Sequence, residues 1–203
     1  MVSGGVDLLI TVVVPFHTHR EKNGYLQRAL NSIHRQTIEG IQVIAVRDEE
    51  GQGAPATRHA GLMLVGTPWV AFLDSDDEMD PEHLEKLLDT AETTGADYVY
   101  SHYRVKGGRD PFPKFLGQPW DNNKPHETTV TTLVRTELAQ RVGFLASNDV
   151  RSADSKNSRE DWFFTLGCMN AGAKIVHRPE ITWTWHHHGA NTSGLAGRGD
   201  ARP

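Results

Sequence analysis

Residues 8–15, LLITVVVP, are the stretch that decides the fold. The run is apolar throughout, rich in β-branched side chains and closed by a proline, which is typical of a strand buried on both faces of a parallel sheet. The residues before it, 1–7, lack the positive flank and the long apolar stretch of a secretory signal. We therefore expect the chain to open with a fully buried strand of an α/β fold.

Three further apolar runs follow, with helical segments between them. The predicted strands cover residues 41–46, 69–73 and 97–101. Right-handed crossovers make strands that are joined in this way mostly parallel. The β-α-β-α-β-α-β order predicts one α/β domain, with a mostly parallel central sheet flanked by helices on both faces.

The segments between the runs show the spacing of amphipathic helices. Such a helix is expected over residues 24–35. The next is expected to turn Ala60, Met63 and Leu64 toward the sheet, and Pro81 opens a third at a favourable first-turn position.

The pattern loosens in the second half of the chain. Residues 106–124 are rich in glycine and proline and predict a long loop. Strands are then expected over residues 128–134, 175–177 and 181–186, and helices over 136–142 and 160–171. We divide the domain into a first half, 1–105, a second half, 106–190, and a mobile tail, 191–203.

The composition narrows the class of protein. The chain has 203 residues with a net charge of −5 and no dense basic run, so a nucleic-acid partner is not favoured. Its single cysteine, Cys168, can form no internal disulfide, and no apolar run approaches the roughly 20 residues that span a bilayer. These features predict a cytoplasmic protein without a membrane span.

Acidic residues crowd the end of the third predicted strand. Asp74, Ser75 and Asp76 follow it directly, at the edge where open α/β sheets bind ligands. Carboxylates so close together repel one another unless a cation compensates. One or two carboxylates plus substrate phosphates are the usual ligands of Mg²⁺, so we expect Mn²⁺ or Mg²⁺ here. The alternative is a turn in which Asp77 or Asp80 caps the next helix.

Six segments share their order and spacing with one protein family. They are VVVPFHTHREKNGYLQRALNSIHRQT, VIAVRDEEGQGAPATRHAGL, WVAFLDSDDEMDPEHLEKLL, TTLVRTELAQRVGF, REDWFFTLGCMNAG and WHHHGANTS, and they span nearly the whole chain. This set resembles the family 2 glycosyltransferases of the GT-A fold. The resemblance implies a metal-dependent enzyme that moves a sugar from a nucleotide-diphosphate sugar, with UDP favoured, to an acceptor hydroxyl.

The resemblance also assigns roles in the first half of the chain by position. Pro15, Phe16 and His17 would form the floor of the nucleotide pocket. Asp48 would contact the base or ribose, and Arg58 would lie close to the donor. Asp48 could instead be an ordinary turn residue, and Arg58 could simply pair with a surface acid.

Further roles concern the metal and the base. Asp74 and Asp76 match the Asp-x-Asp signature, with Asp76 coordinating the metal and Ser75 counted among the donor-binding residues. His188 would close the site near the metal and diphosphate. Asp161 takes the position of the catalytic base, although an acidic pair could also simply favour a helix N-terminus.

The roles suit the chemistry. Negative charge builds on the leaving diphosphate, and a metal offsets it without a proton donor. The acceptor hydroxyl needs a base, and a positioned carboxylate contributes about 10²–10⁴-fold. Direct attack by the hydroxyl would invert the anomeric centre.

The three histidines at residues 186–188 allow a second interpretation. On a strand, His186 and His188 share one face and could hold zinc with a carboxylate. We favour His188 alone as functional, with His186 and His187 as packing or polar-face residues.

The sequence departs from the family at the base pocket. Many relatives have Tyr-Asn where this chain has His17-Thr18, and an Asp doublet where it has Arg47-Asp48. Two other functions stay open: a non-catalytic sugar-nucleotide-binding module, and a sugar-phosphate nucleotidyltransferase. The latter would need a glycine-rich basic loop after the first strand, and PFHTHREKNG has one glycine. The acceptor is left open among a saccharide, a lipid-linked intermediate, a protein side chain and a modified nucleobase.

Overall fold

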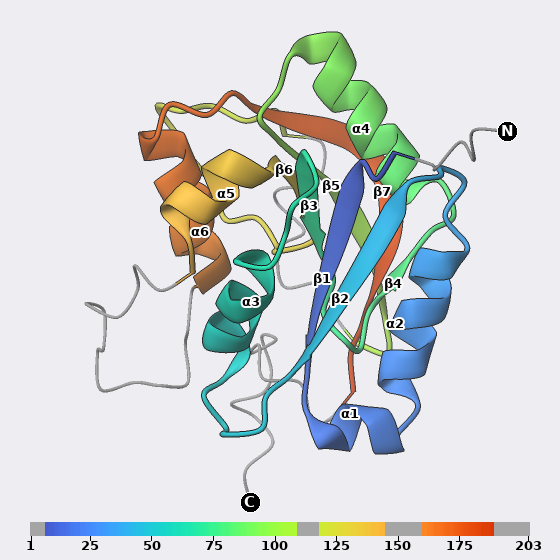
Figure 1. The fold of residues 1–203 in the computed structure, drawn as a ribbon. Coiled ribbons are helices and arrows are strands. Elements are labelled where there is room, and N and C mark those ends of the chain that lie inside the picture. The colour runs from blue at the N-terminus through green and yellow to red at the C-terminus, as the bar shows by residue number, and fades with distance from the viewer. Residues whose placement is uncertain (1–6, 109–117, 145–159, 189–203) are drawn as a thin grey trace, which may run out of the picture.

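The computed structural model describes residues 7–108, 118–144 and 160–188. Within these ranges a seven-stranded sheet has the order β2-β1-β3-β6-β5-β7-β4 (Figure 1). The strands are β1 (Ile10–Phe16), β2 (Ile41–Arg47), β3 (Trp69–Phe72), β4 (Glu78–Met79), β5 (Tyr98–Lys106), β6 (Thr132–Arg135) and β7 (Ile175–His186). β1 is parallel to β2 and β3, as the crossover argument predicts, and β5 is parallel to β7. β6 is antiparallel to both of its neighbours.

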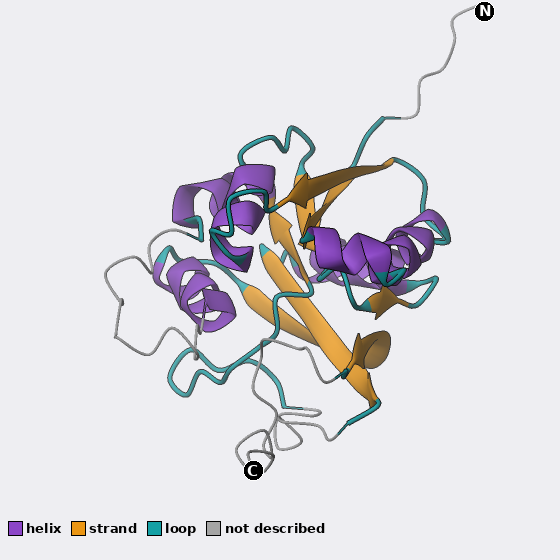
Figure 2. Cartoon of the chain, turned by 90° about the horizontal axis from the view of Figure 1, so that it is seen from below, coloured by secondary structure: helices purple, strands orange, loops and turns teal. Residues whose placement is uncertain are grey.

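Helices cover the two faces of the sheet, as Figures 1 and 2 show. They are α1 (Thr18–Lys22), α2 (Tyr25–His34), α3 (Ala54–Leu62), α4 (His83–Thr94), α5 (Thr136–Val142) and α6 (Glu160–Asn170). Apolar residues of α2 and α4 form one core cluster, and those of α3, α5 and α6 form the other. The predicted α/β class with helices on both faces is confirmed.

The opening strand joins both clusters. Val12 and Val14 pack in the α2 and α4 cluster, whereas Val13 between them packs in the cluster of α3, α5 and α6. All three are 0% exposed. Burying a side chain of this size stabilises the fold by about 1.5–3 kcal/mol relative to leaving it in water. The run therefore lacks the alternation of a half-exposed strand because both of its faces are covered.

The predicted inner face of α3 is wrong. Ala60 is exposed, Met63 is 52% exposed and Leu64 is 70% exposed. The helix instead turns Gly61 and Leu62 to the sheet, and a Cβ on Gly61 would lie 2.6 Å from Val13 Cγ1. A hydrophobic pattern cannot register a glycine whose missing side chain is what allows close packing, so it predicted the wrong face.

Several strand boundaries differ from the predicted ones, because they depend on pairing with strands that are distant in the sequence. The two strands expected at residues 175–177 and 181–186 form one strand, β7, whose pairing with β5 shifts register beside His102. β5 continues to Lys106, beyond its predicted end at residue 101, and β6 begins at Thr132 rather than at residue 128. The short elements α1 and β4 were not predicted.

Two further expectations concerned the C-terminal tail and the lack of a membrane span. The tail at residues 191–203 lies outside the described residues. In the described ranges, none of the helices combines the length and the apolar character that crossing a bilayer requires.

Candidate active site

The predicted site residues gather at the carboxyl edge of β1, β2 and β3. Because the three strands are parallel, the segments that follow them meet at this edge, at the bottom of Figure 1 near α1. Figure 2 looks onto the molecule from that side. Three groups of side chains form there: one around Asp48, one around Arg58 and one around Asp76.

The first group lies between the ends of β1 and β2. His17 Nε2 is 3.6 Å from Asp48 Oδ2, and the Asp48 backbone N–H donates to the Phe16 carbonyl at 2.8 Å. Pro15 is buried in β1, and the Phe16 ring packs against the core. The structure thus brings the predicted nucleotide-pocket residues together, with His17 exposed.

Asp48 also has the turn role weighed as its alternative. Its carboxylate accepts hydrogen bonds from the backbone N–H groups of Gln52 at 2.9 Å and Gly53 at 2.8 Å, and its side chain is 4% exposed. Burial pushes the pKa of this carboxyl up, but the N–H donors and His17 outweigh burial and hold the pKa below its ordinary value. Asp48 is therefore a charged anchor of the loop before α3.

The second group centres on the guanidinium of Arg58, whose residue is 1% exposed. Its Nη2 donates to Asp74 Oδ1 at 2.7 Å. Its Nη1 is 3.6 Å from Glu160 Oε1 and 3.6 Å from Asp161 Oδ1. Arg58 thus connects the Asp-x-Asp segment after β3 with the acidic pair that opens α6, and is not the surface ion-pair residue of the alternative interpretation.

Asp161 is an unusual carboxyl in this group. Burial raises its pKa to about 8, against the lowering effect of Arg58, and Glu160 and Asp74 add to the rise. A backbone hydrogen bond from Val130 acts in the opposite direction. The side chain as a whole is 32% exposed, but its Oδ1 is buried and faces Arg58.

The third group surrounds Asp76. His188 Nε2 lies 2.7 Å from Asp76 Oδ2, and Arg20 Nη1 lies 3.0 Å from the same oxygen. Arg28 donates from Nη2 to the Asp76 backbone carbonyl. The Tyr25 ring stacks on the His188 ring, with centroids 4.8 Å apart. The structure therefore brings His188 to Asp76, as the resemblance implied.

Two further residues of the acidic run, Ser75 and Asp77, are buried. Asp77 Oδ1 accepts from the His186 backbone N–H at 2.9 Å, which ties the run to β7. Asp77 is 3% exposed, and burial together with Asp76 and Asp74 raises its pKa well above the ordinary value. Ser75 is also buried, at 5% exposed.

The three histidines at residues 186–188 face different groups. His188 faces Asp76, whereas His186 Nε2 lies 3.3 Å from Glu78 Oε2 and His187 Nδ1 lies 3.2 Å from the Gly107 carbonyl. Among the described residues, no set of three or more His, Cys, Asp or Glu side chains has the geometry to hold a metal by itself. A metal at this edge would need at least one ligand from outside the described residues, such as a substrate.

Sequence reasoning missed the aromatic and basic side chains around Asp76. Arg20, Tyr25 and Arg28 come from the segment after β1, which was read as a polar turn and the start of a helix. The available signal was the basic character of Arg20 and Arg28, close to the end of a parallel strand.

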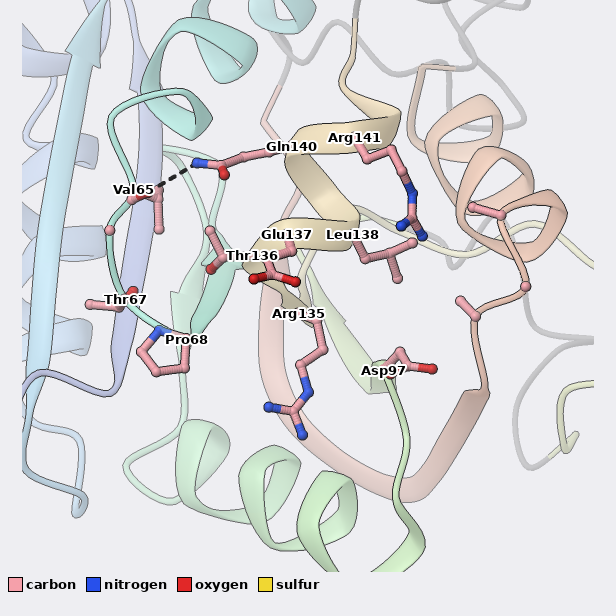
Figure 3. A pocket seen from close by; sticks show the side chains of 14 residues that line it. Val65, Thr67, Pro68, Asp97, Arg135, Thr136, Glu137, Leu138, Gln140 and Arg141 are labelled. Atoms are coloured by element: carbon pink, nitrogen blue, oxygen red, sulfur yellow. Dashed lines mark hydrogen bonds between the residues drawn. The ribbon is translucent and has the colours of Figure 1, made fainter.

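A separate pocket of about 830 Å³ lies at the opposite end of the sheet (Figure 3). Residues 65–68 before β3, the first turns of α5 and residues 171–173 before β7 line it. Gln140 donates to the Val65 carbonyl at 3.0 Å and closes one side. None of the predicted site residues borders this pocket, so it is not the candidate active site.

The sequence comparison decides the family. The model of the family described as glycosyl transferase family 2 matches residues 42–146, more than half of the chain. This chain is a family 2 glycosyltransferase. The matched range contains Asp48, Arg58 and the Asp-x-Asp residues, whereas His17, Asp161 and His188 lie outside it. Family membership confirms the predicted enzyme class and sets aside the nucleotidyltransferase alternative.

Curated relatives of this glycosyltransferase are longer than the part that matches. The succinoglycan biosynthesis protein ExoW of Rhizobium meliloti is 30% identical over 133 residues, which cover 47% of this chain and 41% of ExoW. An uncharacterized glycosyltransferase of Haemophilus influenzae is 22% identical over 86% of this chain and 64% of its own length.

Solved structures show the same fold. S. aureus TarS 1-349 in complex with UDP-GlcNAc has a TM-score of 0.72 at 18% identity, over 91% of this chain and 60% of that one. The same TarS fragment with UDP has a TM-score of 0.70 at 18% identity, over 89% and 61%. The predicted GT-A fold is therefore confirmed.

Proposed function

We propose that this glycosyltransferase moves a sugar from a UDP-sugar to an acceptor hydroxyl, uses Mg²⁺ or Mn²⁺, and inverts the anomeric centre. One observation carries the proposal. Arg58 holds Asp74 and the Asp161 carboxyl in one group, and Asp76 and His188 meet beside it, all at the carboxyl edge of the sheet. The TarS structures that share this fold contain UDP-GlcNAc and UDP, which supports a uridine nucleotide as the donor group.

Asp76 and His188 offer ligand atoms for a divalent cation. Asp76 offers a carboxylate oxygen and His188 a ring nitrogen, 2.7 Å apart. One or two carboxylates with substrate phosphates and water are the usual environment of Mg²⁺, so Asp76 fits it and the His188 nitrogen favours Mn²⁺ over Mg²⁺. Asp74 would be at most a more distant ligand, because Arg58 engages its Oδ1 at 2.7 Å. When bound, the cation would offset the charge that develops on the leaving diphosphate.

Asp161 is the proposed base. As the acceptor oxygen forms its bond to the anomeric carbon, its proton passes to the Asp161 carboxylate. The bond from that carbon to the phosphate oxygen breaks, and its electron pair leaves with the nucleoside diphosphate. The raised pKa of Asp161, about 8, makes its carboxylate a stronger proton acceptor than an ordinary aspartate. Arg58 Nη1 lies 3.6 Å from its Oδ1 and would offset part of its negative charge before the proton arrives.

The two halves of the chain then have different tasks. We propose that residues 1–105 bind the donor, with the uracil and ribose beside His17 and Asp48, whose side chains lie 3.6 Å apart. Residues 106–190, which contain Asp161 and His188, would bind the acceptor. A cytoplasmic location is also proposed, on the absence of paired cysteines in the sequence.

Nucleotide binding tests the donor. We expect UDP with Mn²⁺ to raise the melting temperature more than GDP, TDP or ADP does, and EDTA to remove most of the shift. A larger shift with another nucleoside diphosphate would overturn the uridine assignment alone. Binding and turnover that persist unchanged in EDTA would overturn the metal.

Product analysis tests the reaction. Incubation with candidate UDP-sugars should release UDP, detected by mass spectrometry, and Asp76→Asn should lose most of this activity with an unchanged fold. NMR of the product should show the inverted anomer. Retention of configuration would refute the mechanism with Asp161 as base, and binding without any turnover would favour a non-catalytic binding module.

A further inference from the structure

Three groups at the Asp76 end of the site cannot all satisfy one another. Arg20 Nη1 is 2.5 Å from His188 Nε2 and 3.0 Å from Asp76 Oδ2, and the same His188 nitrogen is 2.7 Å from that oxygen. A guanidinium nitrogen only donates and an ionised carboxylate only accepts. His188 Nε2 can accept from Arg20 or donate to Asp76, but it cannot do both. In either tautomer, one of its two contacts is unfavourable.

A divalent cation in place of the Arg20 nitrogen would remove this conflict. The Asp76 oxygen and the lone pair of His188 Nε2 are both ligands that such cations accept. Their separation of 2.7 Å is close to the roughly 3 Å between neighbouring ligands of an octahedral cation with bonds of about 2.1 Å. Arg20 therefore lies where the cation would have to enter.

Once displaced from Asp76, Arg20 would be placed to pair with the diphosphate of the donor. Its side chain is only 12% exposed and its Cζ lies 5.7 Å from the centre of the Tyr25 ring. Arg28 lies 5.3 Å from the same ring, and its buried Nε has no hydrogen-bond partner among the described residues. Two guanidinium groups beside the cation position suit the charge and the several acceptor oxygens of a diphosphate.

We propose that Arg20 is an exchangeable cation. It pairs with Asp76 in the donor-free enzyme, and it moves onto the diphosphate oxygens of the donor when the metal binds Asp76 and His188. This inference rests on the proposed function, because it needs a metal–diphosphate complex at this edge of the sheet. Its consequence is that metal and nucleotide bind cooperatively: metal alone must displace Arg20 without providing it with a new partner.

Two titrations test the exchange. Mn²⁺ binding without nucleotide is followed by the electron paramagnetic resonance of free Mn²⁺, and UDP binding at saturating Mn²⁺ by calorimetry. In Arg20→Gln we expect Mn²⁺ alone to bind about tenfold more tightly and UDP about tenfold more weakly than in the wild type. The control is Arg35→Gln, which removes an exposed ion pair with Glu78 and should change neither affinity.

The outcomes separate the two proposals. If the wild type binds UDP with Mn²⁺ but Arg20→Gln binds Mn²⁺ alone no more tightly than the wild type, the exchange is refuted and the proposed function stands. If the wild type binds no UDP at any Mn²⁺ concentration, the proposed function fails and the exchange fails with it. Should circular dichroism show Arg20→Gln to be unfolded, Arg20→Met keeps the apolar stem beside Tyr25, and the same two titrations apply.

Discussion

Replacing Arg58 by methionine should destabilise the protein strongly, and more strongly at high pH. Arg58 is 1% exposed, and its guanidinium faces Asp74 at 2.7 Å and both carboxylates of the acidic pair at 3.6 Å. Methionine fills much of the volume but leaves those carboxylates without their cation. Removing one partner of a buried ion pair typically costs about 3–5 kcal/mol. We expect a loss in this range at pH 8.5.

The pH dependence follows from proton uptake. The pKa of Asp161 is already raised to about 8 in the presence of Arg58, and without that cation it rises further. The folded state then binds more protons than the unfolded state between the unfolded pKa near 4 and the raised folded pKa. Stability of Arg58→Met therefore falls as pH rises through this window. The wild type falls in the same way only up to its own folded pKa of about 8, whereas the variant goes on falling above it. The loss caused by the substitution should therefore be smaller at pH 6 than at pH 8.5.

Urea unfolding at pH 6 and pH 8.5 provides the measurement, with Arg58→Lys as a control that keeps a positive charge. We expect the loss caused by Arg58→Met to be up to about 0.8 kcal/mol larger at pH 8.5 than at pH 6, which is the most that a carboxyl with a wild-type pKa of about 8 can contribute over this range. Equal losses at both pH values would refute the electrostatic reasoning. They would mean that Arg58 acts through packing, for example against the Phe144 ring 5.2 Å away.

Three further predictions concern other residues. Asp161→Asn should keep UDP affinity while turnover falls by about 10²-fold or more, and normal turnover would show that Asp161 is not the base. His83 is 0% exposed and burial lowers its pKa to about 3, so only the unfolded chain takes up its proton as pH falls below about 6.5. Between pH 7 and pH 5 the free energy of unfolding of the wild type should therefore fall by about 2 kcal/mol more than that of His83→Gln. An equal shift of the urea midpoint between the two pH values in both proteins would contradict this. Gly61→Ala should lower stability by about 1–3 kcal/mol because of the Val13 contact, whereas a raised melting temperature would show that helix propensity outweighs the clash.

The sequence predicted the parallel core of the fold because its signal is local. A strand buried on both faces carries few polar side chains, and residues 10–15, with Thr11 as the exception, and 69–73 show this without reference to any neighbour. Leu8 and Leu9 fit the same apolar pattern, but they precede β1 and are 50% and 38% exposed. The inner face of α3 and the continuity of β7 could not be predicted in the same way. They depend on contact with other strands: Gly61 fits against Val13, and β7 forms along the whole length of β5.

The candidate site also combines features that the sequence predicted with features that only the tertiary structure determined. The sequence by itself determined that Asp48, Asp74 and Asp76 follow strands, because an acidic residue after an apolar run is visible in one dimension. Only the tertiary structure decided which groups face one another. It brings Arg58 to the start of α6, and it brings Arg20 to His188, 168 residues away along the chain. Contacts between segments so distant in sequence are fixed by the packing of the sheet and its helices, and no local pattern encodes them.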